Sequence, residues 1–126
     1  RNDMLADAET EQLYSYLAGE LSKLGLAYIH IVDHSSQGAP EVPAVMKAGI
    51  REVFHGALIL LGSYDRSRAE MDLSADRGDL VAFGRPFLAN PDLVDRLRNG
   101  AALNQPDSNT FYTPGEKGYI DYPLAT

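Results

Sequence analysis

Two apolar runs in the second half of the chain each end at a glycine, and they constrain the fold more than any other feature. The first is Ala57-Leu58-Ile59-Leu60-Leu61, followed by Gly62-Ser63, and the second is Leu80-Val81-Ala82-Phe83, followed by Gly84-Arg85. Continuous apolar runs without polar alternation are typical of strands buried on both faces of a parallel sheet. The sequence therefore predicts two parallel strands, each with a glycine at its carboxyl end.

Helix-like and strand-like patterns alternate along the rest of the chain. Apolar spacings of three and four residues, a proline at a first helical turn and glycines after last turns mark the helices. The predicted helices span residues 7–24, 43–56, 67–76 and 90–100, and the predicted strands span residues 27–33, 57–61 and 80–83. This alternation predicts an α/β fold in which helices cover a parallel sheet.

Two of the predicted helices begin with residues that are typical of helix N-caps. Ser67 and Glu70 form the S-x-x-E pattern of a capping box, and Asn90 precedes a proline and an aspartate as a predicted N-cap. In the first helix, one apolar face is predicted to contain Leu13, Leu17, Leu21 and Leu24.

The predicted sheet is too small to stand as a closed architecture. Three parallel strands cannot form a barrel, but they can be the last three βα units of a (β/α)₈ barrel, with about five strands before them. Residues 1–100 are then the C-terminal part of the barrel. Residues 101–126 have no periodicity but contain aromatic side chains, so we expect an ordered, irregular tail that packs over the barrel.

The ends of the two glycine-terminated strands suggest a phosphate site. Glycine lets the backbone approach phosphate oxygens closely, and the planar guanidinium of arginine can donate two parallel hydrogen bonds to them. In (β/α)₈ barrels the loops after strands 7 and 8 frequently form such a site. We therefore expect Gly62, Ser63, Gly84 and Arg85 to bind phosphate. The alternative is that both are ordinary β-to-α turns that require glycine.

The composition excludes several classes of function. The 126 residues carry a net charge of −7, which gives no electrostatic reason to bind nucleic acid or an anionic membrane surface. The absence of cysteine excludes disulfides and thiolate metal sites and is consistent with a cytoplasmic protein. No apolar run approaches the length of a membrane span.

The histidines do not form a metal-binding pattern. His30 lies within a predicted strand and His55 at a helix end, so both are expected to have structural roles. His34 follows the carboxyl end of a strand, where a pocket role is possible in a barrel. The sequence contains no Walker loop, G-x-G-x-x-G fingerprint or zinc-ligand spacing.

Aromatic and acidic residues outside the strands have both functional and structural interpretations. Phe111 and Tyr112 could close a ligand pocket with flat rings, or could simply anchor the tail. Asp72, Asp76 and Asp79 are interpreted as solvated charges at helix ends.

A long segment of the chain resembles the old yellow enzyme family. It runs from Asp79 to Leu97, with the sequence DLVAFGRPFLANPDLVDRL, and is reinforced by Leu103-Asn104, by Thr110-Phe111-Tyr112 and by the run GYIDYP that begins at Gly118. Residues 2–30 are similar to the fifth helix and sixth strand of the same family. The resemblance covers nearly the whole chain.

The resemblance implies a flavoenzyme. Members are (β/α)₈ barrels that bind FMN non-covalently, take hydride from NAD(P)H and deliver it to activated alkenes or nitro compounds. By resemblance, the FMN phosphate would be held by Gly62, Ser63, Gly84 and Arg85. Phe111 and Tyr112 would lie beside the flavin, and Tyr112 would also contact the small-molecule substrate.

The family's substrate-anchoring pair and proton donor belong to earlier strands, and none of the three histidines matches the pair. We therefore expect no catalytic residue in this segment, which alone would be inactive and would need the N-terminal part of the barrel as its partner. The alternative is a non-catalytic half-barrel that binds a phosphate ligand or associates with another copy of the chain.

Overall fold

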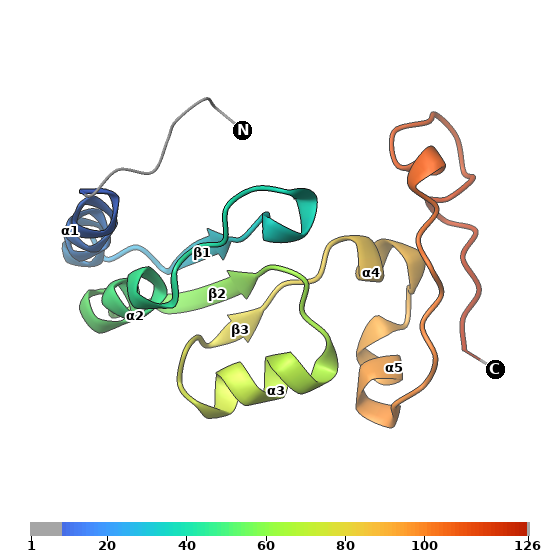
Figure 1. The fold of residues 1–126 in the computed structure, drawn as a ribbon. Helices are drawn as coiled ribbons and strands as arrows, with labels where there is room; N and C mark the ends of the chain where they lie inside the picture. The colour runs from blue at the N-terminus through green and yellow to red at the C-terminus, as the bar shows by residue number, and fades with distance from the viewer. Residues whose placement is uncertain (1–8, 126) are drawn as a thin grey trace. The chain divides into compact units, whose positions relative to one another are not determined.

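The structure is a computed structural model that describes residues 9–125, and it divides into two compact units, Arg1–Ala82 and Phe83–Thr126. In the first unit, helices and strands alternate along the chain (Figure 1). They are α1 (Thr10–Lys23), β1 (Tyr28–Val32), the 3₁₀ helix η1 (Ser35–Gln37), α2 (Ala44–Val53), β2 (Ala57–Leu61), α3 (Arg66–Ser74) and β3 (Leu80–Val81).

The three strands form a parallel sheet in the order β1-β2-β3. This confirms the predicted α/β class. The strand predicted at residues 57–61 has the observed bounds, whereas β1 is one residue shorter at each end than predicted. β3 ends early, because its last ladder contact is the hydrogen bond from Ala82 N–H to the Leu60 carbonyl. The start predicted for the first helix at residue 7 lies outside the described residues.

The register of the sheet separates a covered face from an open one. Tyr28 pairs with Ala57 and Ile31 with Leu60, and paired residues of parallel strands point to the same face. The covered face packs against α1 and α2, and the buried core consists of Ala18, Ile31, Ile50, Phe54, Leu58 and Leu60. On the opposite face, Leu80 is 54% exposed. Tyr28 and Val32 on the same face are also exposed.

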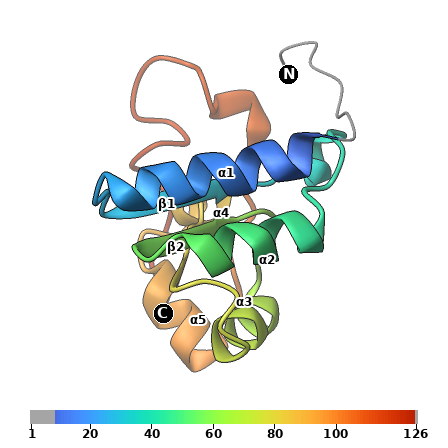
Figure 2. The ribbon, with the colours of Figure 1, turned by 90° about the vertical axis from the view of Figure 1, so that its left-hand side faces the viewer.

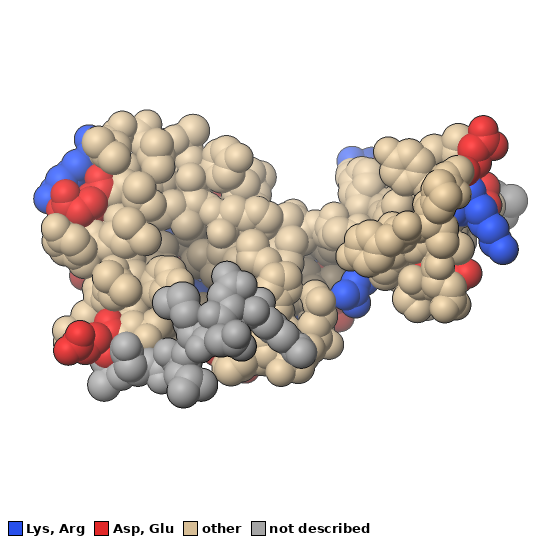
Figure 3. Space-filling model, turned by 90° about the horizontal axis from the view of Figure 1, so that it is seen from above, with Lys and Arg blue, Asp and Glu red and all other residues tan. Residues whose placement is uncertain are grey.

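The predicted leucine face of α1 is only partly buried. Helices α1 and α2 lie side by side (Figure 2), and Ala18 and Leu21 of α1 contact the core. Leu13 and Leu24 are 59% and 75% exposed, and Leu17 is also exposed, because α2 covers only part of the helix surface. Uncharged residues make up most of the first unit's surface on the face that Figure 3 turns to the viewer.

The capping box predicted for the third helix is wrong. Asp65 is the N-cap of α3, and its carboxylate accepts a hydrogen bond from the Arg68 N–H at 2.8 Å. Ser67 therefore lies inside the first turn. Aspartate competes well with serine for this position, because both place an acceptor oxygen over the free N–H groups of the first turn. Helix α2 ends at Val53, three residues before the predicted stop, because Phe54 adopts an extended backbone.

The second unit contains two short helices, α4 (Arg85–Ala89) and α5 (Leu93–Asn99), and the 3₁₀ helix η2 (Ser108–Thr110). Helix α4 was not predicted. Asn90 is not the N-cap of α5, which begins after Asp92. The Asn90 side chain is fully buried and donates to the carbonyl oxygens of Pro86 and Asn104. Because its side chain is bonded to Asn104, fourteen residues later, Asn90 does not cap the helix as predicted.

Candidate functional site

The loop after β2 carries the first two predicted site residues. Gly62 has φ 153° and Ser63 has φ 49°, a range that disfavours residues with a side chain. A Cβ atom at Gly62 would lie 2.7 Å from the Cβ of Asp33. Gly62 is therefore required by the packing of the loop against Asp33. The glycine at position 62 is therefore not by itself evidence for a bound ligand.

Asp33, directly after β1, is a buried carboxylate with three partners. It accepts hydrogen bonds from the backbone N–H groups of Ser35 at 2.9 Å and Val42 at 3.4 Å, and it pairs with the Lys47 ammonium at 3.0 Å. Burial alone would raise the pKa of Asp33, but the bonds from Ser35 and Lys47 outweigh it and lower the pKa to about 2. The carboxylate therefore stays charged and holds both ends of the β1–α2 connection.

Arg68 fixes the loop after β2 from the side of α3. Its Nη1 donates to the Gly62 carbonyl oxygen at 2.9 Å, and its Cζ lies 4.5 Å from the centroid of the Tyr64 ring. The Tyr64 hydroxyl in turn donates to Asp72 at 2.7 Å. Burial, together with this hydrogen bond, raises the pKa of Tyr64 to about 12. The loop, the ring and the helix thus form one connected set of contacts.

Two of the three aspartates interpreted as solvated charges have structural partners instead. Asp72 is buried and accepts hydrogen bonds from Tyr64 and Arg77. Asp79 accepts from Arg51 and from the backbone N–H of Leu58. Arg77 lies only five residues after Asp72, whereas the partners of Asp79 come from α2 and β2 and are not evident in the local sequence. Asp76 is exposed as expected, beside Arg51.

Gly84 and Arg85 begin helix α4 in the second unit. Gly84 has a negative φ of −93°, and no atom lies within 4 Å of where a Cβ would stand. In contrast to Gly62, the described chain gives no packing reason for glycine here. Arg85 is exposed and forms no ion pair within residues 9–125. Its one recorded contact places Cζ 5.8 Å from the Phe111 ring centroid.

Phe111 and Tyr112 lie at the end of η2. Their rings meet edge to face, with centroids 6.4 Å apart and an interplanar angle of 89°. Phe111 is half-buried, whereas Tyr112 is 97% exposed. The second unit therefore brings together Arg85, Phe111 and Tyr112, as a cation beside one ring and a second ring open to solvent.

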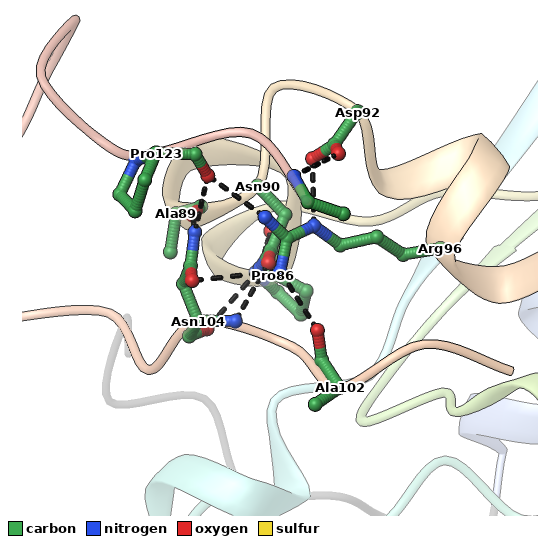
Figure 4. A network of polar contacts seen from close by, with 9 residues as sticks. Pro86, Ala89, Asn90, Asp92, Arg96, Ala102, Asn104 and Pro123 are labelled. Atoms are coloured by element: carbon green, nitrogen blue, oxygen red, sulfur yellow. Dashed lines mark hydrogen bonds and ion pairs between the residues drawn. The ribbon is translucent and has the colours of Figure 1, made fainter.

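A buried arginine holds the segment that carries these aromatic residues. Arg96 is 5% exposed, and its guanidinium donates to Asp92 and to the backbone carbonyls of Ala102 and Pro123 (Figure 4). Asn104 also donates to the Pro123 carbonyl, at 2.8 Å. Both ends of the tail are thus hydrogen-bonded to Arg96 of α5.

A groove of about 650 Å³ lies between α2 and α3, and Leu60, Tyr64 and Arg68 also line it. Three cations on its walls are already paired: Lys47 with Asp33, Arg51 with Asp79 and Arg77 with Asp72. The described residues contain no cluster of three metal-ligating side chains and no helix long and apolar enough to cross a membrane.

Comparison with known proteins assigns the chain to a family. The family model described as "NADH:flavin oxidoreductase / NADH oxidase family" matches residues 2–104. The chain belongs to this family. The predicted resemblance to old yellow enzymes is confirmed, and with it the general chemistry of the family, oxidation and reduction with a flavin and a nicotinamide.

Named relatives in this flavin oxidoreductase family are all longer than the chain. A 12-oxophytodienoate reductase-like protein from Solanum lycopersicum is 41% identical over 120 residues, which cover 94% of this chain and 32% of the relative. Morphinone reductase, solved in complex with tetrahydroNAD, is 48% identical with a TM-score of 0.86, over 97% of this chain and 32% of that one. The old yellow enzyme from Trypanosoma cruzi is 35% identical with a TM-score of 0.83, over 95% and 31%. The chain spans about a third of the length of these relatives.

The described residues fit the flavin oxidoreductase family's need for a bound phosphate group. The second unit offers an exposed arginine without an ion-pair partner among the described residues, next to a glycine whose missing side chain leaves open space. The first unit offers the loop at Ser63. Sequence reasoning missed Asp33, Arg68 and Arg96. An aspartate directly after an apolar strand was a usable signal for Asp33, and Asp92, four residues before Arg96, was one for Arg96. The backbone carbonyls to which both arginines donate cannot be read from the sequence.

Proposed function

We propose that this chain supplies the FMN-phosphate side of an NAD(P)H-dependent oxidoreductase of the old yellow enzyme type. The observation that carries the proposal is Arg85, an exposed cation directly after a glycine that the packing does not require, in a chain that belongs to a flavin oxidoreductase family. A phosphate monoester ligand would explain both residues.

Each residue has a defined part in this proposal. Arg85 binds two phosphate oxygens through its planar guanidinium. Gly84 leaves room for the phosphate to approach the backbone. By resemblance to the family, Gly62 and Ser63 of the first unit are also proposed to bind the phosphate. FMN, when bound, would supply hydride transfer from NAD(P)H to an activated alkene or a nitro compound.

The aromatic pair would border the flavin. Phe111, held beside Arg85, would exclude water from the charged contact, and the exposed ring of Tyr112 would lie against the flavin and the substrate. We assign no proton transfer to these residues. The substrate-anchoring and proton-donating groups are proposed to come from the rest of the barrel, so that the chain alone would be inactive.

Substitution of Arg85 by alanine in the complete protein tests this function. We expect FMN binding to weaken by roughly 2–5 kcal/mol, because a charge pair with the phosphate is lost, while riboflavin, which lacks the phosphate, should bind as before. Arg98→Ala is the matched control, since Arg98 is an exposed arginine of the same unit that pairs with Asp95. A loss of FMN affinity below about 0.5 kcal/mol would remove Arg85 from the phosphate site.

A second candidate is a non-catalytic half-barrel that associates with another copy of itself. The exposed apolar side chains of α1 and of the open sheet face favour it, because contiguous apolar surface of this kind marks interaction sites. A chain with this function would bind neither FMN nor substrate as an enzyme does.

A further inference from the structure

The peptide between Gly62 and Ser63 has a fixed orientation. It is trans, since the described chain contains no cis peptide, so its carbonyl and its N–H point in opposite directions. The carbonyl oxygen accepts a hydrogen bond from Arg68 Nη1 at 2.9 Å. The Ser63 N–H therefore points away from Arg68, and it has no hydrogen-bond partner among residues 9–125.

The guanidinium of Arg68 is itself held in place. It lies over the Tyr64 ring at 4.5 Å, and the Tyr64 hydroxyl is bonded to the buried Asp72. Asp72 is paired in turn with Arg77. Because stacking and hydrogen bonds constrain Arg68, its bond to the Gly62 carbonyl has a preferred geometry that a free surface arginine would not provide.

The backbone angles of the loop agree with an imposed orientation. Ser63, a non-glycine residue, has φ 49°, a conformation that is costly unless the surroundings stabilise it. Rotation of the 62–63 peptide would relieve this cost but would break the Arg68 contact. The contact with Arg68 therefore favours an orientation of this peptide in which the Ser63 N–H has no partner among the described residues.

We propose that Arg68 is a positioning residue for phosphate: by binding the Gly62 carbonyl, it directs the Ser63 N–H towards an oxyanion. This rests on the proposed FMN function and extends it to a side chain that does not itself bind the ligand. Its role is to organise the donor before the phosphate arrives, so that binding need not include the reorientation of a peptide.

The test compares FMN with riboflavin in the complete protein. For Arg68→Met, which keeps much of the side-chain volume and removes the donor, we expect FMN to bind about tenfold more weakly, because one hydrogen bond to a charged group is lost. Riboflavin affinity should not change, which also shows that the variant is folded. Arg68→Lys keeps the charge and a donor but loses the planar group that stacks on Tyr64, so it should recover only part of the lost FMN affinity. Arg66→Met, in the same helical turn, is the matched control and should leave the ratio of the two affinities unchanged.

A second readout separates positioning from a direct ionic contact. In the parent protein, saturating FMN should shift the Ser63 amide resonance strongly downfield, as expected for an N–H that donates to phosphate. In Arg68→Met at saturating FMN, we expect this shift to be absent. If the shift persists, or if Arg68→Met retains the parent's preference for FMN over riboflavin, Arg68 does not act through Ser63. If the parent protein binds FMN no better than riboflavin, or if Arg85→Ala keeps the parent's affinity for FMN, the proposed function itself is wrong.

Discussion

At the scale of single residues, two glycines that look alike in the sequence have different causes. Gly62 is confined by Asp33, whereas Gly84 faces open space and has an unexceptional φ. The fold therefore requires glycine at position 62, whereas glycine at position 84 is better explained by a bound ligand. The sequence presents both as the glycine at the end of an apolar strand.

Substitution of Gly62 or Gly84 by alanine should distinguish a glycine required by the fold from one required by the ligand. Gly62→Ala is expected to lower the free energy of unfolding by more than about 1 kcal/mol, because the new methyl group meets Asp33 in a strained backbone. Gly84→Ala should change it by less than about 0.5 kcal/mol yet weaken FMN binding by about tenfold. Denaturant unfolding and FMN titration of both variants measure the two effects. Equal loss of stability in both would contradict the distinction.

Asp33 should make the stability depend on pH in the acid range. Its pKa is lowered to about 2 in the folded state, from an ordinary value of 3.8. Its contribution is therefore fully present above about pH 4 and is lost as the pH falls from about 4 through 2. Asp33→Asn should cost about 2 kcal/mol at pH 7 and progressively less below pH 4. Urea unfolding of both proteins at pH 7, 4 and 3 tests this, and a constant difference would contradict it.

At the scale of elements, a strand was easier to predict than the start of a helix. Residues 57–61 are an apolar β-prone run between two glycines, so local sequence determines both ends. Four side chains near residues 65–67 and 90–92 could each cap a helix: Asp65, Ser67, Asn90 and Asp92. In the second pair a distant contact decides, because Asn90 pairs with Asn104, which leaves Asp92 to precede α5. Arg68 was missed because its hydrogen-bond acceptor is a main-chain carbonyl, which any residue offers. Arg96 has a readable partner in Asp92, but its two carbonyl acceptors could not be predicted from the sequence.

Helix α5 and the tail should lose their connection when Arg96 is replaced. In Arg96→Met, the carbonyl groups of Ala102 and Pro123 lose their buried donor. We expect the amides of residues 105–125 to exchange with solvent at least tenfold faster, because local opening of the tail becomes less costly. Hydrogen exchange followed by mass spectrometry measures this, with Arg98→Met as an exposed control on the same helix. Unchanged exchange would show that the tail is held by other contacts.

At the scale of the whole molecule, the described chain leaves apolar surface uncovered. Leu13 and Leu24 on α1 and Leu80 on the open sheet face are more than half exposed. The edge strands β1 and β3 each have one described neighbour. In the longer relatives, of which the chain spans about a third, further chain is available to cover such surfaces.

Residues 1–126 expressed alone should therefore associate or bind apolar dyes. We expect a dimer or larger species by light scattering, or strong binding of anilinonaphthalene sulfonate, because the open faces lack partners. Co-expression with the preceding part of a related barrel should reduce both signals if the surfaces belong to a barrel interior. A stable dimer that binds no dye, and that is unchanged by co-expression with the preceding barrel part, would favour the self-associating half-barrel. A monomer that binds no dye would contradict both interpretations.

The hydrogen bonds accepted by Asp33 have a consequence for how a sequence of this kind can vary. One carboxylate bonds the N–H groups of Ser35 and Val42, so the two ends of the intervening loop are held together regardless of what lies between them. Residues could be inserted or deleted between them without disturbing β1 or the start of α2, since lengthening a loop whose ends are fixed costs little. Such a segment could diversify during evolution while its anchor stays unchanged.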